Sequence, residues 1–257
     1  MKLLFVLVWT LALNAAAFSP QRPQPVAPDA PAHAQATADS ADDEGTSVED
    51  KATGAVWRVH TVRKEIALTF DDGPYPFYTP VLLHVLERSR IPATFFIVGR
   101  SAQEFPELVS RIVDSGDEIG NHTFNHFTLT GLPDGQIADQ ISSDGAFLER
   151  FTGKPLTLFR PPHGHINRHV VAIASELGYR TILWSDAAND VKNIPPDVIV
   201  RRVLGEASPG GIILLHSGQY RTIEALPDII VGLRDQGYTF VTVSRLIEDG
   251  QMAPAPP

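Results

Sequence analysis

The sequence predicts an α/β protein in which parallel strands close into a barrel covered by helices. Short apolar runs alternate with amphipathic stretches along about 200 residues, which is typical of strands joined by crossover helices. Hydrophobic residues make up 43% of the 257-residue chain, enough for one sizeable core. Strand–helix alternation over about 200 residues favours one barrel-shaped domain rather than two domains. In such a barrel, functional side chains gather at the carboxyl ends of the strands.

The expected strands are short apolar runs, each bounded by polar or turn residues. They cover Ile66–Phe70, Ala93–Val98, Glu118–Gly120, Leu156–Phe159, Thr181–Trp184, Gly211–Leu215 and Thr239–Val243. The expected helices cover about 79–89, 104–115, 134–151, 167–177, 196–207 and 222–236. Gly116, Gly178 and Gly237 stand just past three of these helices, where a left-handed cap is favoured.

The two ends of the chain differ in composition from the predicted domain at 56–250. Residues 1–17 resemble a secretory signal peptide, with one early lysine, an apolar run and Ala-x-Ala spacing. The apolar run is shorter than the ~20 residues of a bilayer-spanning helix. After cleavage we expect no stable membrane span and a secreted or periplasmic location; an uncleaved anchor is the alternative. Residues 18–55 are predicted to be a disordered acidic linker, and 251–257 a disordered tail.

Charge and cysteine content exclude several classes of function. The formal charge is −9, and seven acids against one base fall in residues 18–50. The domain is therefore mildly acidic and has no basic stripe, which argues against a nucleic-acid partner. The chain has no cysteine, so a disulfide framework and a thiolate metal site are both excluded. A metal ion would need His, Asp or Glu as ligands.

Polar side chains interrupt the apolar pattern where five of the expected strands end. These segments are Asp71-Asp72, Asn121-His122-Thr-Phe-Asn-His126, Arg160-Pro-Pro-His163-Gly164, Trp184-Ser-Asp186-Ala-Ala-Asn-Asp190 and Leu214-Leu-His216-Ser217. Because the parallel strands of a barrel all end at the same end of the barrel, we expect these polar groups to lie close together. Their convergence is stronger evidence for a site than any of the segments alone.

His122 and His126 are candidate metal ligands. They are four residues apart, so both rings can face one point from a single turn or a tight loop. Two imidazoles with one carboxylate, from Asp71 or Asp72, leave a position open for water, as catalytic zinc sites do. A histidine pair at this spacing is weak evidence alone, because such pairs are common on surfaces and in cores.

The adjacent Asp71 and Asp72 require a reason, because neighbouring carboxylates repel and one would tend to protonate. A divalent cation removes that penalty. Neighbours in an extended chain point in opposite directions, so one carboxylate can bind metal while the other acts as a base. Asp-Asp-Gly-Pro is also ordinary turn chemistry, and Gly73 and Pro74 are expected to form that turn. A turn alone does not explain the histidines and the arginine on neighbouring strand ends.

In order and spacing, "TFDDGP", "HTFNH", "RPPHG", "WSDAAND" and "LLHS" resemble the motifs of the polysaccharide deacetylase (NodB-homology) family of carbohydrate esterases. The resemblance covers about residues 60–247. It implies a distorted (β/α)7 barrel in a single polysaccharide deacetylase catalytic domain. It also implies one divalent metal ion, zinc in the first place and cobalt or another ion as alternatives. The reaction implied is hydrolysis of N-acetyl or O-acetyl groups on sugars.

The resemblance also assigns a role to each matching residue. The metal ligands correspond to Asp72, His122 and His126. Asp71 resembles the general base and Arg160 the arginine that pairs with it, while His216 resembles the general acid and Asp190 the carboxylate that tunes this acid. Leu214 resembles the apolar wall for the acetyl methyl, and His163 the residue whose backbone N–H holds the oxyanion. His163 stands where the family often has Tyr. Val191 replaces an aromatic residue, and the first aspartate of that motif is missing or displaced to Asp186.

Together these features predict a secreted metal-dependent deacetylase. We expect it to remove N-acetyl groups from an amino-sugar polymer such as peptidoglycan, a chitin-like chain or poly-N-acetylglucosamine, with the acetylated glycan as its partner and acetate as product. One alternative is an O-acetyl esterase of the xylan type, or a hydrolase of non-sugar amides on the same barrel. Another is a non-catalytic carbohydrate-binding relative.

Overall fold

The structure, a computed structural model, describes residues 47–49 and 53–251. The expected signal peptide at 1–17, most of the expected linker at 18–55 and residues 252–257 of the expected tail lie outside these residues. Within the described part, no helix has the length and apolar character that a membrane crossing requires.

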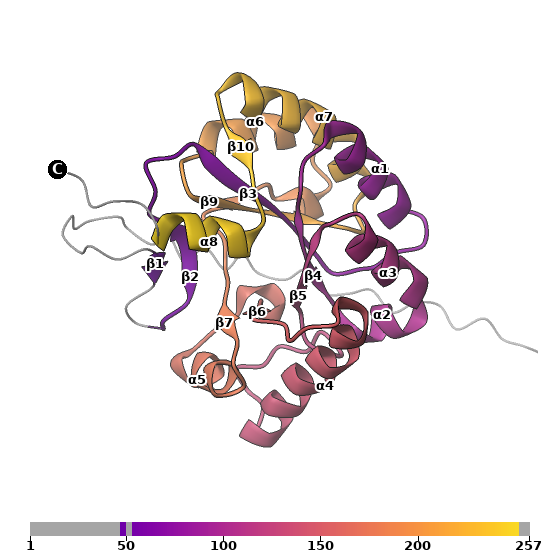
Figure 1. Cartoon of the computed structure of the whole chain (residues 1–257), viewed down its shortest axis with the longest axis vertical. Coiled ribbons are helices and arrows are strands. Elements are labelled where there is room, and N and C mark those ends of the chain that lie inside the picture. The colour runs from indigo at the N-terminus through magenta and orange to yellow at the C-terminus, as the bar shows by residue number, and fades with distance from the viewer. Residues whose placement is uncertain (1–46, 50–52, 252–257) are drawn as a thin grey trace, which may run out of the picture. The chain divides into compact units, whose positions relative to one another are not determined.

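Strands and helices alternate along most of the described chain (Figure 1). The strands are β1 (Ser47–Glu49), β2 (Val56–Val59), β3 (Glu65–Asp71), β4 (Thr94–Ile97), β5 (Glu118–Asn121), β6 (Leu158–Phe159), β7 (Arg180–Thr181), β8 (Asp186–Ala187), β9 (Gly211–His216) and β10 (Thr239–Phe240). The helices are α1 (Thr79–Ser89), α2 (Gly99–Glu104), α3 (Pro106–Asp114), α4 (Asp134–Thr152), α5 (Arg168–Glu176), α6 (Pro196–Glu206), α7 (Tyr220–Asp235) and α8 (Val243–Gln251). Short 3-10 helices cover η1 (Pro162–Gly164) and η2 (Asp190–Lys192).

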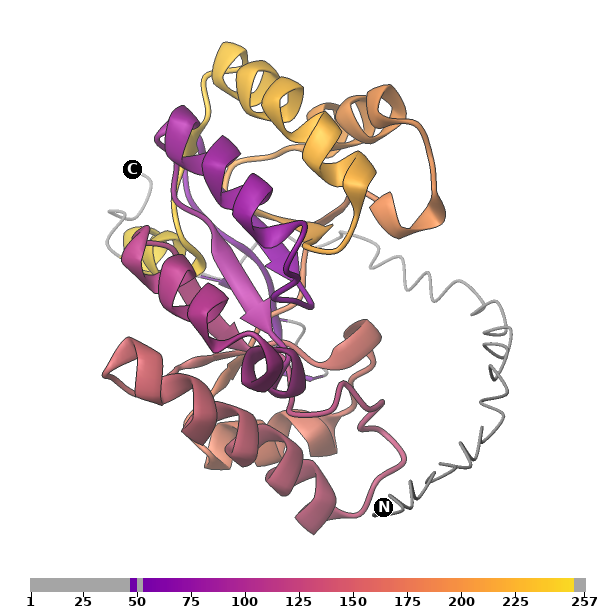
Figure 2. The ribbon, with the colours of Figure 1, turned by 90° about the vertical axis from the view of Figure 1, so that its right-hand side faces the viewer.

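The strands form a nearly closed, mostly parallel barrel, which confirms the predicted fold class. Their order is β1-β2-β9-β3-β4-β5-β6-β7, with β10 paired to β3 and β8 paired to β9. The pairs from β9 to β7 are parallel, whereas β2 pairs antiparallel with β1 and β9. The ring closes where β8 returns to β9 and an isolated bridge joins Val56 to Ile182. Helices surround the strands in the view of Figure 2.

Alternation along the strands separates two apolar layers. On β3, Ile66, Leu68 and Phe70 face the helices and belong to the larger core cluster. Ala67 on the same strand belongs to a second cluster inside the barrel. Because side chains alternate along a strand, Thr69 and Asp71 share the inner face with Ala67. The apolar interior therefore gives way to polar groups toward the carboxyl ends of the strands.

Helix α8 was not predicted from the sequence, and it closes the other end of the barrel interior. Val243, Leu246 and Ile247 pack in the inner cluster with residues of β2, β3 and β9. Figure 1 shows α8 beside β2 and β3. The sequence prediction placed a strand at Thr239–Val243, but β10 ends at Phe240 and Val243 begins this helix. Side chains and a helix thus fill the interior, leaving the site at the opposite end.

Three further elements differ from the predictions. The helix expected at 104–115 is present as α3, and it is preceded by α2, which was not predicted; Phe105 separates the two helices, because Pro106 disfavours helical geometry in the residue before it. β1 and β2 add two strands, and β1 falls inside the range expected to be a linker. The predicted strand Thr181–Trp184 is replaced by β7, the bridge at Ile182 and β8.

Candidate active site

The predicted metal ligands converge where β3 and β5 end. The Asp72 Oδ1 atom lies 3.2 Å from His126 Nε2 and 3.6 Å from His122 Nε2. Among the described residues this is the one group of three or more potential ligand side chains, with ligand atoms all within 4.8 Å of one another. Ligands at 2.0–2.2 Å from a tetrahedral zinc ion stand about 3.3 Å apart, so the donor set and its spacing fit such an ion.

Local backbone geometry brings these three side chains together. Asp72 has a φ of +67° and His126 a φ of +59°, so the chain turns sharply at both positions. The loop after β5 is held by Thr123, whose amide donates to Asn121 Oδ1 at 2.9 Å and whose Oγ1 accepts from the His126 amide at 3.1 Å. His122 Nδ1 lies 2.7 Å from the Arg160 carbonyl oxygen. Donation from Nδ1 to this carbonyl leaves Nε2 free to bind a metal.

Asp71, unlike Asp72, forms an ion pair with Arg160. The guanidinium of Arg160 is fully buried and donates to Asp71 Oδ1 at 2.6 Å and to Thr69 Oγ1 at 2.7 Å. It also donates to the carbonyl of Leu183 and lies 4.0 Å from the Phe96 ring centroid. The ion pair and the hydrogen bonds of Arg160 therefore fix the position of the Asp71 carboxylate. The other Asp71 oxygen lies 3.8 Å from His122 Nε2.

His216 stands next to Asp71 across the sheet, and Asp190 holds it there. The two residues are register partners on β3 and β9, so they occupy the same level of the barrel. Asp190 accepts from the His216 amide and lies 2.8 Å from His216 Nδ1. Thr222 Oγ1 donates to the same carboxylate at 2.6 Å. This arrangement fixes the imidazole and directs Nε2 away from Asp190.

The protein environment shifts the pKa values of His122, Asp72 and His216. Burial lowers the pKa of His122, against the attraction of the nearby aspartates, which favours the neutral imidazole that a metal requires. Burial opposes the charged form of Asp72, but the hydrogen bond with His126 and the nearby imidazoles outweigh it and lower its pKa. For His216 burial is also outweighed, because the bond and charge of Asp190 raise its pKa to about 9. His216 is therefore protonated at neutral pH.

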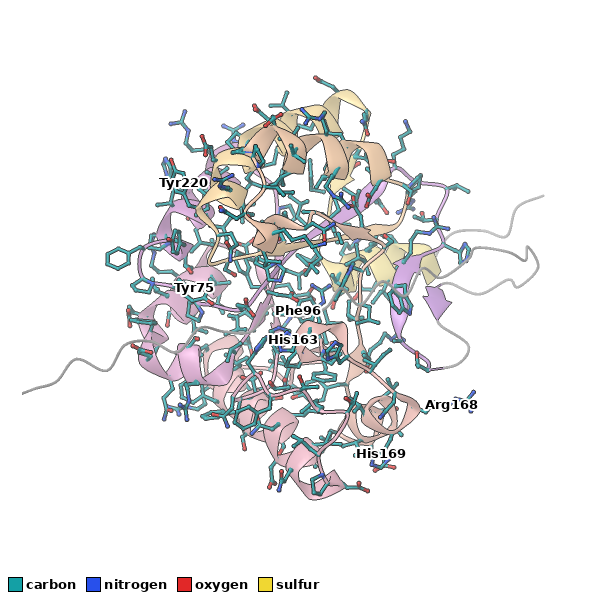
Figure 3. The ribbon with its side chains drawn as sticks, turned by 180° about the vertical axis from the view of Figure 1, so that it is seen from behind. Tyr75, Phe96, His163, Arg168, His169 and Tyr220 are labelled. Atoms are coloured by element: carbon teal, nitrogen blue, oxygen red, sulfur yellow. The ribbon has the colours of Figure 1, made fainter. Side chains whose placement is uncertain are left out.

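The two predicted substrate-binding residues border this group. His163 is exposed in η1 with a φ of +61°, and its ring centroid lies 4.8 Å from that of His126. Leu214 is buried on β9, two residues before His216 and in register with Thr69. In Figure 3, His163 lies near the middle of the view, with Tyr75 and Tyr220 toward one side.

The structure decides between two alternatives that the sequence left open for Asp186, and it adds two residues. Asp186 does not join the site; it is buried on β8 near Glu206 and Arg202. Asp144 on α4 is fully buried and its Oδ2 accepts from the His122 amide at 2.9 Å. The Tyr75 ring packs against Gly73, the residue after Asp72, and burial together with the Asp72 charge raises the pKa of its phenol. Helical periodicity does not distinguish Asp144 from a surface acid, and Tyr75 follows the turn without any motif of its own.

Fold and site together define a mostly parallel α/β barrel that carries a candidate metal centre beside the buried Asp71 and the partly buried His216. Comparison with known proteins places this barrel in a family. The sequence pattern of the polysaccharide deacetylase family matches residues 58–182. A peptidoglycan-N-acetylglucosamine deacetylase of Bacillus cereus is 43% identical over 201 residues, which cover 76% of this chain and 94% of that protein. A peptidoglycan-N-acetylmuramic acid deacetylase of Bacillus subtilis, PdaA, is 38% identical over 75% of each chain. The chain belongs to the polysaccharide deacetylase family, a family of deacetylase hydrolases.

Solved structures show that this fold is shared by active and inactive members. The Bacillus anthracis protein BA3943, described as a CE4 family pseudoenzyme, has a TM-score of 0.74 and 32% identity, covering 78% of this chain and 71% of that one. A mutant of it is described as having restored enzymatic activity. The Bc1960 peptidoglycan N-acetylglucosamine deacetylase has a TM-score of 0.73 and 35% identity, covering 75% and 92% of the two chains. The fold alone therefore does not decide activity, and the side chains of the site must.

Proposed function

We propose that this protein is a metal-dependent deacetylase that hydrolyses N-acetyl groups of peptidoglycan or a closely related amino-sugar polymer outside the cytoplasm. The observation that carries the proposal is the pairing of Asp71 and His216 at one level of the barrel, beside the Asp72–His122–His126 group. The relatives named as peptidoglycan deacetylases support the choice of polymer. The leader-like residues 1–17 support export.

The three proposed metal ligands are Asp72, His122 and His126. A divalent ion held by them would supply a Lewis acid that polarises the acetyl carbonyl and lowers the pKa of water. Asp144 supports this set from the second layer, because its carboxylate fixes the backbone of His122. The Arg160 carbonyl fixes the His122 ring in the same way.

Asp71 accepts the proton of the attacking water in this proposal. Its ion pair with Arg160 orients the carboxylate, and the buried position excludes competing water from one side. The backbone N–H of His163 is assigned to the developing oxyanion, by analogy with the family, and Leu214 forms the apolar wall for the acetyl methyl.

His216 donates a proton to the departing amine nitrogen. An amine leaves only when protonated, whereas an alkoxide from an O-acetyl ester needs this help less. The raised pKa of His216 keeps it protonated at neutral pH, which favours an N-deacetylase over an O-acetyl esterase. All of the side chains assigned to this cycle are present, which argues against a non-catalytic relative.

The test measures acetate release from peptidoglycan by the metal-reconstituted full chain, with and without a chelator. We expect release that the chelator abolishes and zinc or cobalt restores. Asp72→Ala and His126→Ala should lose stoichiometric metal by elemental analysis, while His84→Ala, at an exposed histidine on α1, retains it. Asp71→Asn should retain metal and lose acetate release. Full metal content in both ligand variants would overturn the ligand assignment, and chelator-resistant release would overturn metal dependence.

A further inference from the structure

The exposed aromatic side chains gather at the end of the barrel that carries the candidate active site. Phe77, Phe127 and Tyr220 are 83%, 54% and 65% exposed. They follow the carboxyl ends of β3, β5 and β9, the strands that lead into the site. The other large exposed apolar residues of the described chain are aliphatic: Val62, Val81, Leu177, Val191 and Val231. Exposed apolar side chains that are grouped around a site indicate a binding surface, because leaving apolar surface in water is unfavourable.

Phe77 stands on the loop between β3 and α1, Tyr220 is the first residue of α7, and the segments that lead to them touch two residues after His216. A side chain at Gly218 would meet the Tyr75 ring at 2.7 Å, so this ring packs directly on the Gly218 backbone. Phe77 lies two residues beyond Tyr75, and Tyr220 lies two residues beyond Gly218. Figure 3 shows Tyr75 and Tyr220 toward the same side of the molecule. We call Phe77 and Tyr220 the acid-side pair.

Phe127 follows β5, which β4 separates from β3, whereas Tyr220 follows β9 on the other side of β3. Phe127 directly follows His126, whose ring packs against that of the exposed His163 at 4.8 Å between centroids. Exposed aromatic residues therefore stand on the segments that carry the candidate metal ligands and on those that carry the proposed acid.

We propose that the acid-side pair and Phe127 bind the sugar units on either side of the reacting unit, so that the protein acts on internal units of a glycan chain. The proposal rests on the proposed function and deepens it. The C–H faces of a pyranose ring are apolar while its hydroxyl groups point outward at the edge. Such a ring packs on an aromatic face and keeps its hydroxyls in water, which suits aromatic rings that are exposed rather than enclosed.

The experiment compares the dimer and the hexamer of β-1,4-linked N-acetylglucosamine as substrates of the metal-loaded full chain. The readout is the ratio of kcat/KM for hexamer over dimer. We expect the wild-type ratio to be well above one. Tyr220→Ala and Phe77→Ala should each lower it about tenfold through KM, the loss expected of one stacked ring. Val62→Ala is the matched control, because Val62 is 86% exposed in the turn before β3, at the opposite end of that strand; its ratio should stay unchanged.

A separate binding measurement keeps this proposal distinct from the proposed function. Absence of acetate release from either oligomer would refute the deacetylase proposal, and hexamer binding followed by calorimetry would then decide the inference. Hexamer affinity that exceeds dimer affinity and falls in Tyr220→Ala supports the acid-side pair. Equal wild-type affinities for the two oligomers, or an unchanged ratio in both aromatic variants, would overturn it.

Discussion

Asp190→Asn tests whether the Asp190 charge makes His216 an acid. Asp190 accepts from the His216 amide, its Oδ1 lies 2.8 Å from Nδ1, and Thr222 donates to it as well. Asparagine keeps the size of the side chain and removes its charge. Burial lowers the His216 pKa, and the hydrogen bond and charge of Asp190 are the largest of the opposing effects that raise it to about 9, ahead of the charges of Asp71 and Asp72. Without the Asp190 charge the pKa should fall to about 6.5 or lower, the ordinary value for histidine.

The size of the effect follows from the protonated fraction. At pH 7.5 an imidazole with a pKa of about 9 is roughly 97% protonated, whereas one with a pKa of about 6.5 is roughly 9% protonated. N-acetyl hydrolysis at that pH should therefore drop about tenfold or more, and the alkaline limb of the pH profile should move toward neutral pH. A bound divalent cation lowers the His216 pKa in both proteins, so the two are compared at equal metal content.

The assay follows acetate release against pH for an N-acetylated glycan and for 4-nitrophenyl acetate. The phenolate leaves without a proton, so the variant should retain much more activity on the aryl ester than on the amide. Asp197→Asn, at an exposed residue of α6, serves as the matched control. An alkaline limb that stays in place in Asp190→Asn, or equal losses on both substrates, would refute the role of this pair.

Three further predictions concern stability. Arg160→Ala should lower the free energy of unfolding by about 3–5 kcal/mol in urea titrations, because it strands the buried Asp71 carboxylate. Burial and a neighbouring carboxylate raise the pKa of Asp186 to about 8, so the folded protein keeps a proton that the unfolded chain loses above about pH 4. Wild-type stability should therefore fall between about pH 4 and 8, and Asp186→Asn should reduce that fall. Gly120→Ala should cost about 1–3 kcal/mol in thermal unfolding, because its Cβ would meet the Phe96 ring at 2.6 Å.

Each of these variants has a matched control and a contradicting result. Arg201→Ala removes an exposed ion pair and should cost under about 1 kcal/mol; an equal loss in both arginine variants contradicts the first prediction. Asp197→Asn should leave the pH slope unchanged, and a wild-type slope in Asp186→Asn contradicts the second. Gly131→Ala adds a methyl group to open space. Equal unfolding temperatures for the two alanine variants contradict the third.

Sequence periodicity predicted those parts of the barrel whose residues alternate clearly. The strand expected at Ile66–Phe70 is present as β3, because a short apolar run that ends in polar residues is a clear signal. Polar residues at strand ends were predictive because parallel strands bring their carboxyl ends together. The break before Pro106 could have been read from the sequence, since proline restricts the residue that precedes it.

Features that depend on long-range packing were not predictable. β2 pairs with β9 through a single registered residue, Arg58, and gives too short a signal to indicate closure. Asp144 lies within the regular pattern of α4, and its hydrogen bond with the His122 amide depends on the packing of α4 beside the end of β5. Tyr75 becomes part of the site because Gly218, far away in sequence, leaves room for its ring.

Arg160 contacts two parts of the candidate site, one through its side chain and the other through its backbone. Its guanidinium contacts the proposed base, while its own carbonyl oxygen orients the ring of His122. A main-chain acceptor persists through any replacement at this position, but a side-chain donor does not. Any replacement of Arg160 therefore keeps the acceptor that orients His122 but leaves the Asp71 carboxylate without its cation, so only the Asp71 side of the candidate site depends on which residue stands at this position.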